Sequence, residues 1–315
     1  MNNKIYVVIV TYNRLDKLKK ALSCYTSQSY LPSRIIVIDN CSTDGTSEYL
    51  KEWETDNKSV DKTVIRTERN LGGAGGFKIG MQTALSMDPD WVWISDDDAY
   101  PQKDALQIVN DNIGKKEYGN VACFCGAVYE RSFDNIGFQH RRNSEKKKGV
   151  YVPSPVKTED YQRDFLYIEE TTFVGSCYNA EALRKAGPPN DSFFIYYDDT
   201  EHSHRVNKQG KIVLLPKCKI LHDTASKKSD PNVISTWRDY YFVRNHVYTL
   251  KEYHKLTYAV YCCYKIYKII MAYKKNRNKD ALKLNLTALS DGIHARLGIH
   301  NLYAPGFEIK KKSVG

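Results

Sequence analysis

Two almost wholly apolar runs, separated by one helix-length segment, limit the folds that this chain can adopt. Residues 5–11, IYVVIVT, and residues 34–39, RIIVID, are rich in β-branched side chains. Continuous runs of this kind are typical of strands that are buried on both faces of a parallel sheet. Residues 12–27, which lie between them, carry apolar side chains at helical spacing. The pattern predicts two parallel strands joined by a helix.

The same alternation continues along the chain. KTVIRTER, residues 62–69, predicts a third strand and WVWIS, residues 91–95, a fourth. Strands that alternate with helices indicate an α/β fold with a Rossmann-like, mostly parallel, doubly wound sheet. After about residue 235 the chain becomes rich in tyrosine and lysine and predicts helices. We therefore expect an α/β domain over residues 1–235 and a C-terminal helical, basic and aromatic region over residues 236–315.

Polar or glycine-rich sequence follows each of the four predicted strands. The four segments are TYNR (11–14), DNCSTDG (39–45), RNLGGAGG (69–76) and SDDD (95–98). In open α/β sheets, ligands bind beyond the carboxyl ends of the strands. Four such ends on one edge of a sheet predict a ligand cleft there.

The segment WVWISDDDAYP, residues 91–101, runs from a buried strand straight into three carboxylates. Like charges at a strand end repel one another unless a cation compensates them. Asp96 and Asp98 alternate along the strand direction and can point to one side, whereas Asp97 faces the other way. Carboxylates are ligands suited to Mg²⁺ or Mn²⁺, which can bridge two phosphates. The triplet therefore predicts a metal and diphosphate site, with a solvated turn as the alternative.

Residues 70–80, NLGGAGGFKIG, place glycines after a strand and at the start of a predicted helix. Glycine lets a ligand approach the backbone closely, and a helix N-terminus favours anions. The segment lacks both G-x-G-x-x-G and the G-K-[ST] ending of a Walker A sequence, so neither a dinucleotide site nor a P-loop is favoured. A flexible hairpin without a ligand is the alternative.

Residues 193–206, FFIYYDDTEHSHRV, lead from aromatic side chains into a cluster of carboxylates. Asp199 and Glu201 beside an aromatic wall can deprotonate a hydroxyl, although one carboxylate at a helix start is commonly an N-cap. His222 follows a strand-like run. Such a histidine is more often structural, but near a metal site it becomes a candidate ligand.

Taken together, the motifs VVIVTYNR, VIDNCSTDGT, NLGGAGGF, DDDAYP and FFIYYDDTEHSHR resemble, in order and spacing, the family-2 inverting glycosyltransferases with a GT-A fold. Within that family the subgroup of bacterial galactofuranosyltransferases and rhamnosyltransferases is the most similar. The resemblance covers about residues 4–250. TFVGSCYNAEALRKAG (172–187) resembles the segment under the acceptor, and WRDYYFVRN (237–245) also resembles the subgroup, without a firm role for Arg244.

The resemblance implies a role for particular residues. The donor-binding residues would be Thr11, Tyr12 and Arg14 at the nucleotide, Asp39 at the base, Asn70, Gly73 and Gly76 at the diphosphate and sugar, and Asp96 and Asp97. The metal ligands would be Asp96, Asp98 and His222. The catalytic residues would be Asp199 as general base, with Asp198 as its neighbour on the acceptor side. The acceptor-binding residues would be Gly175, Ser176 and Glu201.

The resemblance also implies the reaction. A sugar would pass from a nucleotide-sugar donor, UDP-galactofuranose first and dTDP-rhamnose as the alternative, to a hydroxyl of a glycan or lipid-linked glycan. Mn²⁺ or Mg²⁺ would serve as cofactor, and single displacement would invert the anomeric carbon. Such chemistry is typical of bacterial surface polysaccharide synthesis, of capsule or O-antigen.

Two other classes of protein compete with this interpretation. A nucleotidyltransferase can use a similar fold and acidic site, but it favours a glycine-rich loop with a basic residue after the first strand, where TYNR stands. The net charge of +10 fits a nucleic-acid-binding protein, yet no recognised nucleic-acid motif accompanies the lysines, so we expect no nucleic acid partner.

The basic segments suggest where the protein resides. One stripe of a predicted helix carries Lys265, Lys268 and Lys275, with tyrosine and isoleucine around the rest. This pattern predicts a helix that packs on the domain, with an oligomer contact as a further option, or a helix that lies on an anionic membrane. Residues 139–160 predict a solvated, mobile loop, or a lid over the cleft. The eight cysteines show no C-x-x-C pair, and neither a signal peptide nor a spanning helix is apparent. We expect a cytoplasmic protein, which is either free or, if the helix lies on lipid, peripheral on the inner face of the cell membrane.

Overall fold

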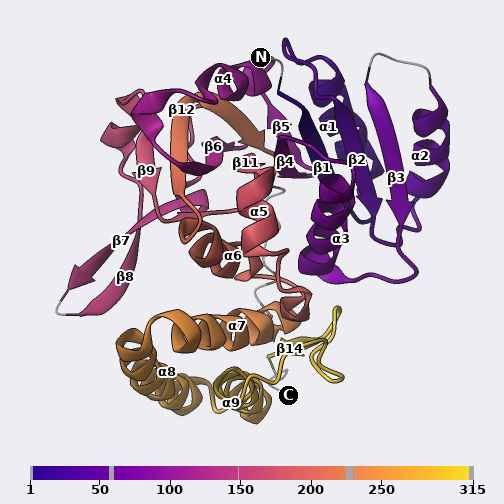
Figure 1. Cartoon of the computed structure of the whole chain (residues 1–315). Coiled ribbons are helices and arrows are strands. Elements are labelled where there is room, and N and C mark those ends of the chain that lie inside the picture. Colours follow the sequence, from indigo (N-terminus) through magenta and orange to yellow (C-terminus); the bar gives the residue numbers. More distant parts are fainter. Residues whose placement is uncertain (1–2, 57–59, 148, 225–229, 231, 312–315) are drawn as a thin grey trace. The chain divides into compact units, whose positions relative to one another are not determined.

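The computed structural model describes residues 3–56, 60–147, 149–224, 230 and 232–311 (Figure 1). A nine-stranded sheet forms its centre, in the order β3-β2-β1-β4-β11-β6-β12-β5, with β9 pairing with β12 outside this path. The chain divides into two compact units. The first comprises Met1–Asn143, Pro153–Asn190 and Asp199–Thr224, and the second comprises Ser144–Val152, Asp191–Asp198 and Ala225–Gly315.

The N-terminal half of the sheet contains the four predicted parallel strands. They are β1 (Ile5–Thr11), β2 (Arg34–Asp39), β3 (Asp61–Arg66) and β4 (Trp91–Asp96). The connecting helices are α1 (Leu15–Thr26), α2 (Thr46–Thr55) and α3 (Gly72–Ser86). Helix α1 begins three residues later than the pattern 12–27 predicts, after Asn13, whose φ of 53° is left-handed and ends the preceding strand.

Side chains alternate between two cores along these strands, as a doubly wound sheet requires. Val8 and Val10 of β1 pack with Phe77 and Met81 of α3 on one face. Their neighbours Val7 and Ile9 pack on the other face, against a core that includes the buried residues of α1 and Leu50 of α2. Both faces of the strands are therefore covered, which is why the sequence of β1 contains no polar alternation.

The C-terminal half of the sheet is mixed. Strand β11 (Ser176–Asn179) runs antiparallel between β4 and β6 (Val121–Glu130), and β6 pairs in parallel with β12 (Lys211–His222). Short strands β5 (Ala99–Pro101) and β9 (Leu166–Ile168) pair antiparallel with β12. The helices of this half are α4 (Ala105–Asn112), α5 (Ala180–Ala186), α6 (Asp198–Asn207) and the 3₁₀ turn η1 (Lys116–Tyr118). The 3₁₀ turn η4 (Asp191–Phe193) belongs to the second unit.

The prediction of a solvated, mobile loop over residues 139–160 is wrong for most of that segment. It contains β7 (Arg141–Lys147) and β8 (Val150–Pro155), which form a three-stranded sheet with β10 (Glu170–Thr171), between η2 (Phe138–His140) and η3 (Thr158–Gln162). Lys148, which was part of the predicted loop, lies outside the described residues. Arg141 is fully buried and donates to the carbonyl oxygens of Gly126 and Val174 at 2.8 and 2.7 Å. The charge of Arg141 favours a solvated loop when only the sequence is considered. In the structure, backbone carbonyl groups accept the hydrogen bonds of its guanidinium in the interior.

The second unit contains the predicted C-terminal helices, α7 (Trp237–Tyr253), α8 (Lys255–Asn276) and α9 (Lys279–Ile293). A two-stranded sheet of β13 (Val233–Thr236) and β14 (Glu308–Lys310) accompanies them. Their core includes Tyr240, Tyr241 and Val247 of α7 together with Leu284 and Ala288 of α9. The predicted α/β class and the helical C-terminal region are confirmed. No helix of the described residues has the length and apolarity needed to cross a membrane.

Candidate active site

The carboxyl ends of the four parallel strands lie side by side at one edge of the sheet. Thr11 of β1 is in register with Asp39 of β2, which is in register with Arg66 of β3. On the other side of β1, Val10 is in register with Asp96 of β4. The polar segments predicted to meet beyond the strand ends are therefore brought together by the sheet.

Cationic side chains from α1 and its N-terminus surround the aspartate triplet. One guanidinium nitrogen of Arg14, Nη1, lies 3.1 Å from Asp97 Oδ1 and 2.8 Å from Asp98 Oδ2. Lys17 Nζ lies 3.4 Å from Asp98 Oδ2. The hydroxyl of Thr11 donates to Asp97 Oδ2 at 2.8 Å. Asp97 is thus held by the end of β1 and by Arg14, whereas Asp98 faces several cations at once.

His222, at the end of β12, faces the other two aspartates. Its Nε2 lies 3.2 Å from Asp98 Oδ1 and 3.9 Å from Asp96 Oδ2. One ligand atom from each of Asp96, Asp98 and His222 lies within 4.8 Å of the other two. At this spacing a single metal ion can bind all three atoms. Two carboxylates and one imidazole suit Mn²⁺, and the carboxylates also suit Mg²⁺. The residues present therefore fit the implied divalent cation.

Burial and mutual repulsion shift the pKa values of this cluster. Burial, followed by the charge of Asp98, raises the pKa of Asp96 to about 7. Burial likewise raises the pKa of Asp97 to about 6, against the opposing charge of Arg14. For Asp98, burial acts to raise the pKa, but the hydrogen bond and charge of His222 together with the charges of Arg14 and Lys17 lower it. The cluster thus favours a cation beside it, because only added positive charge stabilises all three carboxylates in the ionised state.

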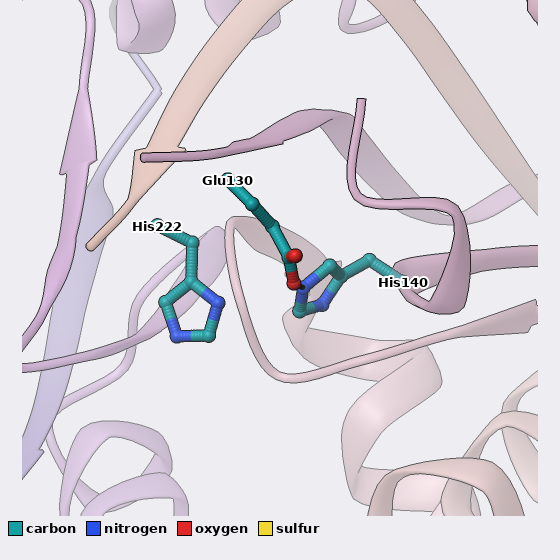
Figure 2. A group of neighbouring side chains, drawn as sticks. All are labelled: Glu130, His140 and His222. Carbon is teal, nitrogen blue, oxygen red and sulfur yellow. Dashed lines mark ion pairs between the residues drawn. The ribbon is translucent and has the colours of Figure 1, made fainter. Parts of the chain in front are cut away.

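Two further side chains that sequence reasoning missed lie beyond His222. Figure 2 shows Glu130, at the end of β6, and His140, in η2, next to His222. The rings of His140 and His222 meet edge to face with centroids 5.1 Å apart. Burial lowers the pKa of His140 to about 4. Neither Glu130 nor His140 stands in a recognisable motif. The pairing of β6 with β12 brings Glu130 beside His222, and η2 adds His140.

The ends of β2 and β3 meet the glycine-rich segment through asparagine side chains. Asp39 is buried, and its Oδ1 accepts from the backbone of Ser42 at 2.8 Å. Its Oδ2 is buried without a hydrogen-bond partner among the described residues, with Arg66 Nη1 at 3.8 Å. Asn40, which sequence reasoning did not single out, accepts from the backbone of Leu71 at 2.9 Å and donates to Asn70 Oδ1 at 3.1 Å.

The predicted glycines differ in their surroundings. A Cβ at Gly73, in the first turn of α3, would meet nothing within 4 Å. A Cβ at Gly76 would lie 2.5 Å from Val10 Cγ1, so Gly76 lets α3 pack closely on β1. Gly73 therefore leaves open space at the helix N-terminus, whereas Gly76 has a packing role that is sufficient to explain it. The exposed ring of Tyr12 lies in the loop after β1.

Asp198 and Asp199 form the first turn of α6. Asp199 Oδ1 accepts from the backbone of Thr200 at 2.6 Å, and Arg142 Nη2 donates to the Thr200 hydroxyl at 3.0 Å. Burial raises the pKa of Asp199, against the opposing charge of Arg142. Among the described residues, Asp199 stands outside the hydrogen-bond network of the aspartate triplet.

The three residues predicted to bind the acceptor are engaged within the protein. Both carboxylate oxygens of Glu201 accept from Arg205, one turn along α6, at 2.8–3.1 Å. Ser176 is fully buried and donates to the carbonyl of Thr172 at 2.7 Å. Gly175 has a φ of 67°, and a Cβ there would lie 2.7 Å from Ile220 Cδ1. These contacts stabilise the fold around the site.

Arg244 and Asn245 of α7 hold the aromatic segment that precedes Asp198. Asn245 Nδ2 donates to the carbonyls of Phe193, Ile195 and Tyr196 at 2.8–3.0 Å. Arg244 Nη2 donates to the carbonyls of Ser192 and Phe193, both at 3.2 Å. Within this segment Phe194, Tyr196 and Tyr197 all have φ values of 64–67°, a conformation that non-glycine residues rarely adopt. The WRDYYFVRN motif thus supplies the donors that stabilise a strained turn.

The fold and the carboxylate-rich strand ends define the class as that of the GT-A glycosyltransferases. Among solved structures, the chain is similar to GalNAc-T7 crystallised with UDP, GalNAc and Mn²⁺, with a TM-score of 0.62 and 16% identity over 79% of this chain and 48% of that one. This likeness concerns the fold.

The chain belongs to glycosyl transferase family 2, whose model matches residues 6–185. It is 30% identical to galactofuranosyltransferase GlfT1 of Mycobacterium tuberculosis over 67% of its length, and the match spans 66% of that relative, just under two thirds. It is 26% identical to the dTDP-rhamnosyl transferase RfbF of Shigella flexneri over 95% of this chain and 98% of that relative. The resemblance inferred from the motifs is confirmed.

Proposed function

We propose that this protein is an inverting glycosyltransferase that moves a sugar from a nucleotide-sugar donor to a hydroxyl of a glycan or lipid-linked glycan. The observation that carries the proposal is the convergence of Asp96, Asp98 and His222, with ligand atoms within 4.8 Å of one another, at the carboxyl edge of a GT-A sheet. Membership of family 2 supports the same reaction class.

On the donor side, Asp39 would accept a hydrogen bond from the nucleotide base through Oδ2, the buried oxygen that has no partner among the described residues. Thr11, Tyr12 and Arg14 would line the nucleotide, and Asn70 would orient the glycine-rich turn through its bond to the backbone of Gly72 at 2.8 Å. The open space at Gly73 would let the diphosphate approach the N-terminus of α3, where backbone N–H groups favour anions. Gly76 would contribute by keeping α3 close to β1.

Asp96, Asp98 and His222 would hold Mn²⁺ or Mg²⁺, with Asp97 supporting them through Thr11 and Arg14. When bound, such an ion neutralises the charge that develops on the departing nucleotide diphosphate. Arg14 and Lys17 already place positive charge beside Asp98, and both side chains would remain close enough to contact the diphosphate.

On the acceptor side, Asp199 would take the proton of the attacking hydroxyl, because its raised pKa makes the carboxylate a stronger base. Asp198 would lie beside it at the start of α6. Attack from the face opposite the nucleotide inverts the anomeric carbon. The internal hydrogen bonds of Ser176 and Glu201 and the close packing of Gly175 against Ile220 support a role in shaping the acceptor cleft through the surrounding backbone.

For the donor we propose UDP-galactofuranose, with dTDP-rhamnose as the second candidate. The 30% identity to GlfT1 favours the first, and the end-to-end match to RfbF favours the second. The product would enter a bacterial surface polysaccharide such as a capsule or O-antigen.

A panel experiment tests the reaction class and the donor together. The full-length protein is incubated with nucleotide sugars and Mn²⁺, and binding and slow donor hydrolysis are measured. We expect UDP-galactofuranose to be bound and hydrolysed, and Asp98→Asn to lose the metal-dependent part of donor binding. Selective use of dTDP-rhamnose would establish the alternative donor, and the absence of binding to every nucleotide sugar would contradict the reaction class.

We further propose that α8 lies on an anionic membrane at the inner face of the cell membrane. In this 22-residue helix the one buried side chain is that of Ile269. Large apolar side chains at i, i+4, i+8, i+11 and i+15 are 44–58% exposed: Leu256, Val260, Tyr264, Tyr267 and Met271. All the charged residues of α8 are lysines, which favours an anionic surface as the partner.

Lys265 shares a helical stripe with Lys268 and Lys275, but its side chain is half-buried, and burial lowers its pKa. The outward face is instead the apolar one, with Lys268, Lys274 and Lys275 exposed around it. Apolar side chains can therefore enter the lipid interface while lysines reach the headgroups.

A further inference from the structure

A second group of metal-ligand side chains lies on the other side of His222. Glu130 ends β6, His222 ends β12, and the two residues are directly in register in the parallel pair. His140 reaches them from η2, as Figure 2 shows. One ligand atom from each of Glu130, His140 and His222 lies within 4.8 Å of the other two, and Glu130 Oε1 lies 3.8 Å from His140 Nε2. Ligand atoms around a tetrahedral zinc ion lie about 3.3 Å apart, so a small movement closes this group on one ion.

The hydrogen bonds of His140 present the correct nitrogen to the group. The side-chain amide of Gln139 donates to Glu130 Oε1, and its nitrogen also lies 3.4 Å from His140 Nε2. Because an amide nitrogen only donates, Nε2 is the acceptor of the ring, and Nδ1–H then donates to the Thr172 hydroxyl at 2.8 Å. A histidine that is oriented through Nδ1–H and presents an unprotonated Nε2 has the usual form of a metal ligand.

His222 offers one nitrogen to each group. Its Nε2 contacts Asp98 at 3.2 Å, while its Nδ1 is buried without a hydrogen-bond partner among the described residues. Figure 2 shows a nitrogen-bearing edge of the His222 ring facing His140. Gln139, the donor that now bridges Glu130 and His140, is exposed and free to swing aside. A cation in its position would have two imidazole nitrogens and one carboxylate oxygen as ligands.

We propose that Glu130, His140 and His222 form a second metal site, selective for an imidazole-preferring transition metal of the Zn²⁺ class, beside the carboxylate-rich site. Imidazole ligands favour Zn²⁺, Co²⁺ and Ni²⁺ over Mg²⁺, whereas the aspartate group favours harder cations. Because His222 belongs to both groups, an ion bound to Nδ1 withdraws electron density from Nε2 and fixes the position of the ring. Nε2 is then a poorer ligand for a second cation. Zn²⁺ therefore acts as an inhibitor that weakens Mn²⁺ at the aspartate site. The site itself does not depend on the proposed transferase reaction.

Metal binding to the full-length protein tests this site without any turnover. Zn²⁺ affinity is measured by calorimetry, and Co²⁺ serves as a spectroscopic probe of tetrahedral nitrogen and oxygen ligation. We expect one Zn²⁺ per chain, an affinity at least 10-fold lower in His140→Ala and in Glu130→Gln, and little change in Asp96→Asn. Gln139→His, a change at an exposed position, adds a fourth ligand and should tighten Zn²⁺ binding.

Three results would overturn the proposal. The first is equal Zn²⁺ affinity in the wild type, His140→Ala and Gln139→His, since the ion would then be adventitious. The second is loss of Zn²⁺ binding in Asp96→Asn, which would place the ion at the aspartate site. The third is a weaker Mn²⁺ affinity in Glu130→Gln and His140→Ala with Zn²⁺ unaffected, which would make the two residues hydrogen-bond supports for His222. If His140→Ala fails to fold, the Zn²⁺ affinities of Glu130→Gln and Gln139→His still test whether the second metal site exists.

Discussion

At the first turn of α6, burial raises the pKa of the Asp199 carboxyl, while Arg142 acts in the opposite direction. A carboxyl whose pKa is raised on folding is neutral in both states at acid pH and therefore costs nothing there. As the pH rises from the unfolded pKa through the folded pKa, stability is lost, and the loss is complete above the folded pKa. The buried position of Asp199 thus lowers the free energy of unfolding above the unfolded pKa and makes the carboxylate a stronger base.

The variant Asp199→Asn should separate these two effects. The amide keeps the acceptor for the Thr200 N–H, so we expect donor binding to be retained and transfer to fall by at least about 100-fold. Its melting temperature should exceed that of the wild type at neutral pH, and the difference should vanish below about pH 4. Thermal unfolding across pH, together with transfer assays, measures both; substantial retained transfer would remove Asp199 from the role of base.

Asp39 supports a second prediction at the residue scale. Replacement of Asp39 by asparagine keeps the Oδ1 acceptor for Ser42 and puts a donor in place of Oδ2, which has no hydrogen-bond partner among the described residues. We expect the affinity for UDP to fall by about 10- to 100-fold, as for loss of a hydrogen bond to a charged group. Asp61→Asn is the matched control, since Asp61 is exposed at the far end of β3 and pairs with Arg34. Equal UDP affinity in Asp39→Asn and the wild type would show that the nucleotide base binds elsewhere.

At the scale of the element, α3 contains two glycines with opposite surroundings. Gly76→Ala forces a methyl group against Val10 Cγ1 at 2.5 Å and should destabilise the protein by about 1–3 kcal/mol. Gly73→Ala meets no atom within 4 Å and should be neutral or stabilising, while weakening donor binding. Chemical denaturation and donor titration on the pair distinguish packing from ligand approach. Equal destabilisation by both variants would contradict this assignment.

Helix α7 controls the strained turn that leads into α6. Asn245→Ala leaves the carbonyls of Phe193, Ile195 and Tyr196 without their common donor, and we expect a loss of about 1–3 kcal/mol. Because Asp198 and Asp199 follow this turn directly, kcat should fall more than the affinity for the donor. Asn285→Ala is the control, since Asn285 donates to Ala281 of its own helix. Identical stability and kcat in Asn245→Ala and the wild type would show that the turn holds its conformation without Asn245.

At the scale of the whole molecule, the exposed apolar face of α8 predicts membrane association. The wild type should sediment with anionic vesicles at low salt and dissociate as salt rises, because each lysine near the surface contributes about 1 kcal/mol. The double variant Val260→Ser, Met271→Ser should bind at least 10-fold more weakly. Leu286→Ser, at an exposed position of α9, is the control. Absence of binding at low salt would contradict the proposal, and a dimer lost in the double variant would identify a second copy as the occupant.

Much of the fold follows from local patterns. Continuous β-branched runs predict β1 and β2, and the helical spacing of Leu18, Ala21 and Leu22 predicts the buried face of α1. The segment over residues 139–160 does not follow such patterns, because β7 is rich in charge, β8 contains two prolines, and Arg141 is buried against carbonyl oxygens. A pattern of hydrophobicity does not predict the burial of a charged residue whose hydrogen bonds go to the backbone carbonyl groups of distant segments.

By itself, the sequence determined the α/β class, the family and the strand ends that carry the polar segments, because each of these depends on residues close together in the chain. The tertiary structure decided what those segments meet. His222 reaches Asp98 only because β12 pairs with β5, and it reaches Glu130 only because β12 pairs with β6. The outward face of α8 likewise depends on which side packs against its neighbours. Contacts between residues this far apart in the chain are set by strand order and packing, and no local spacing encodes them.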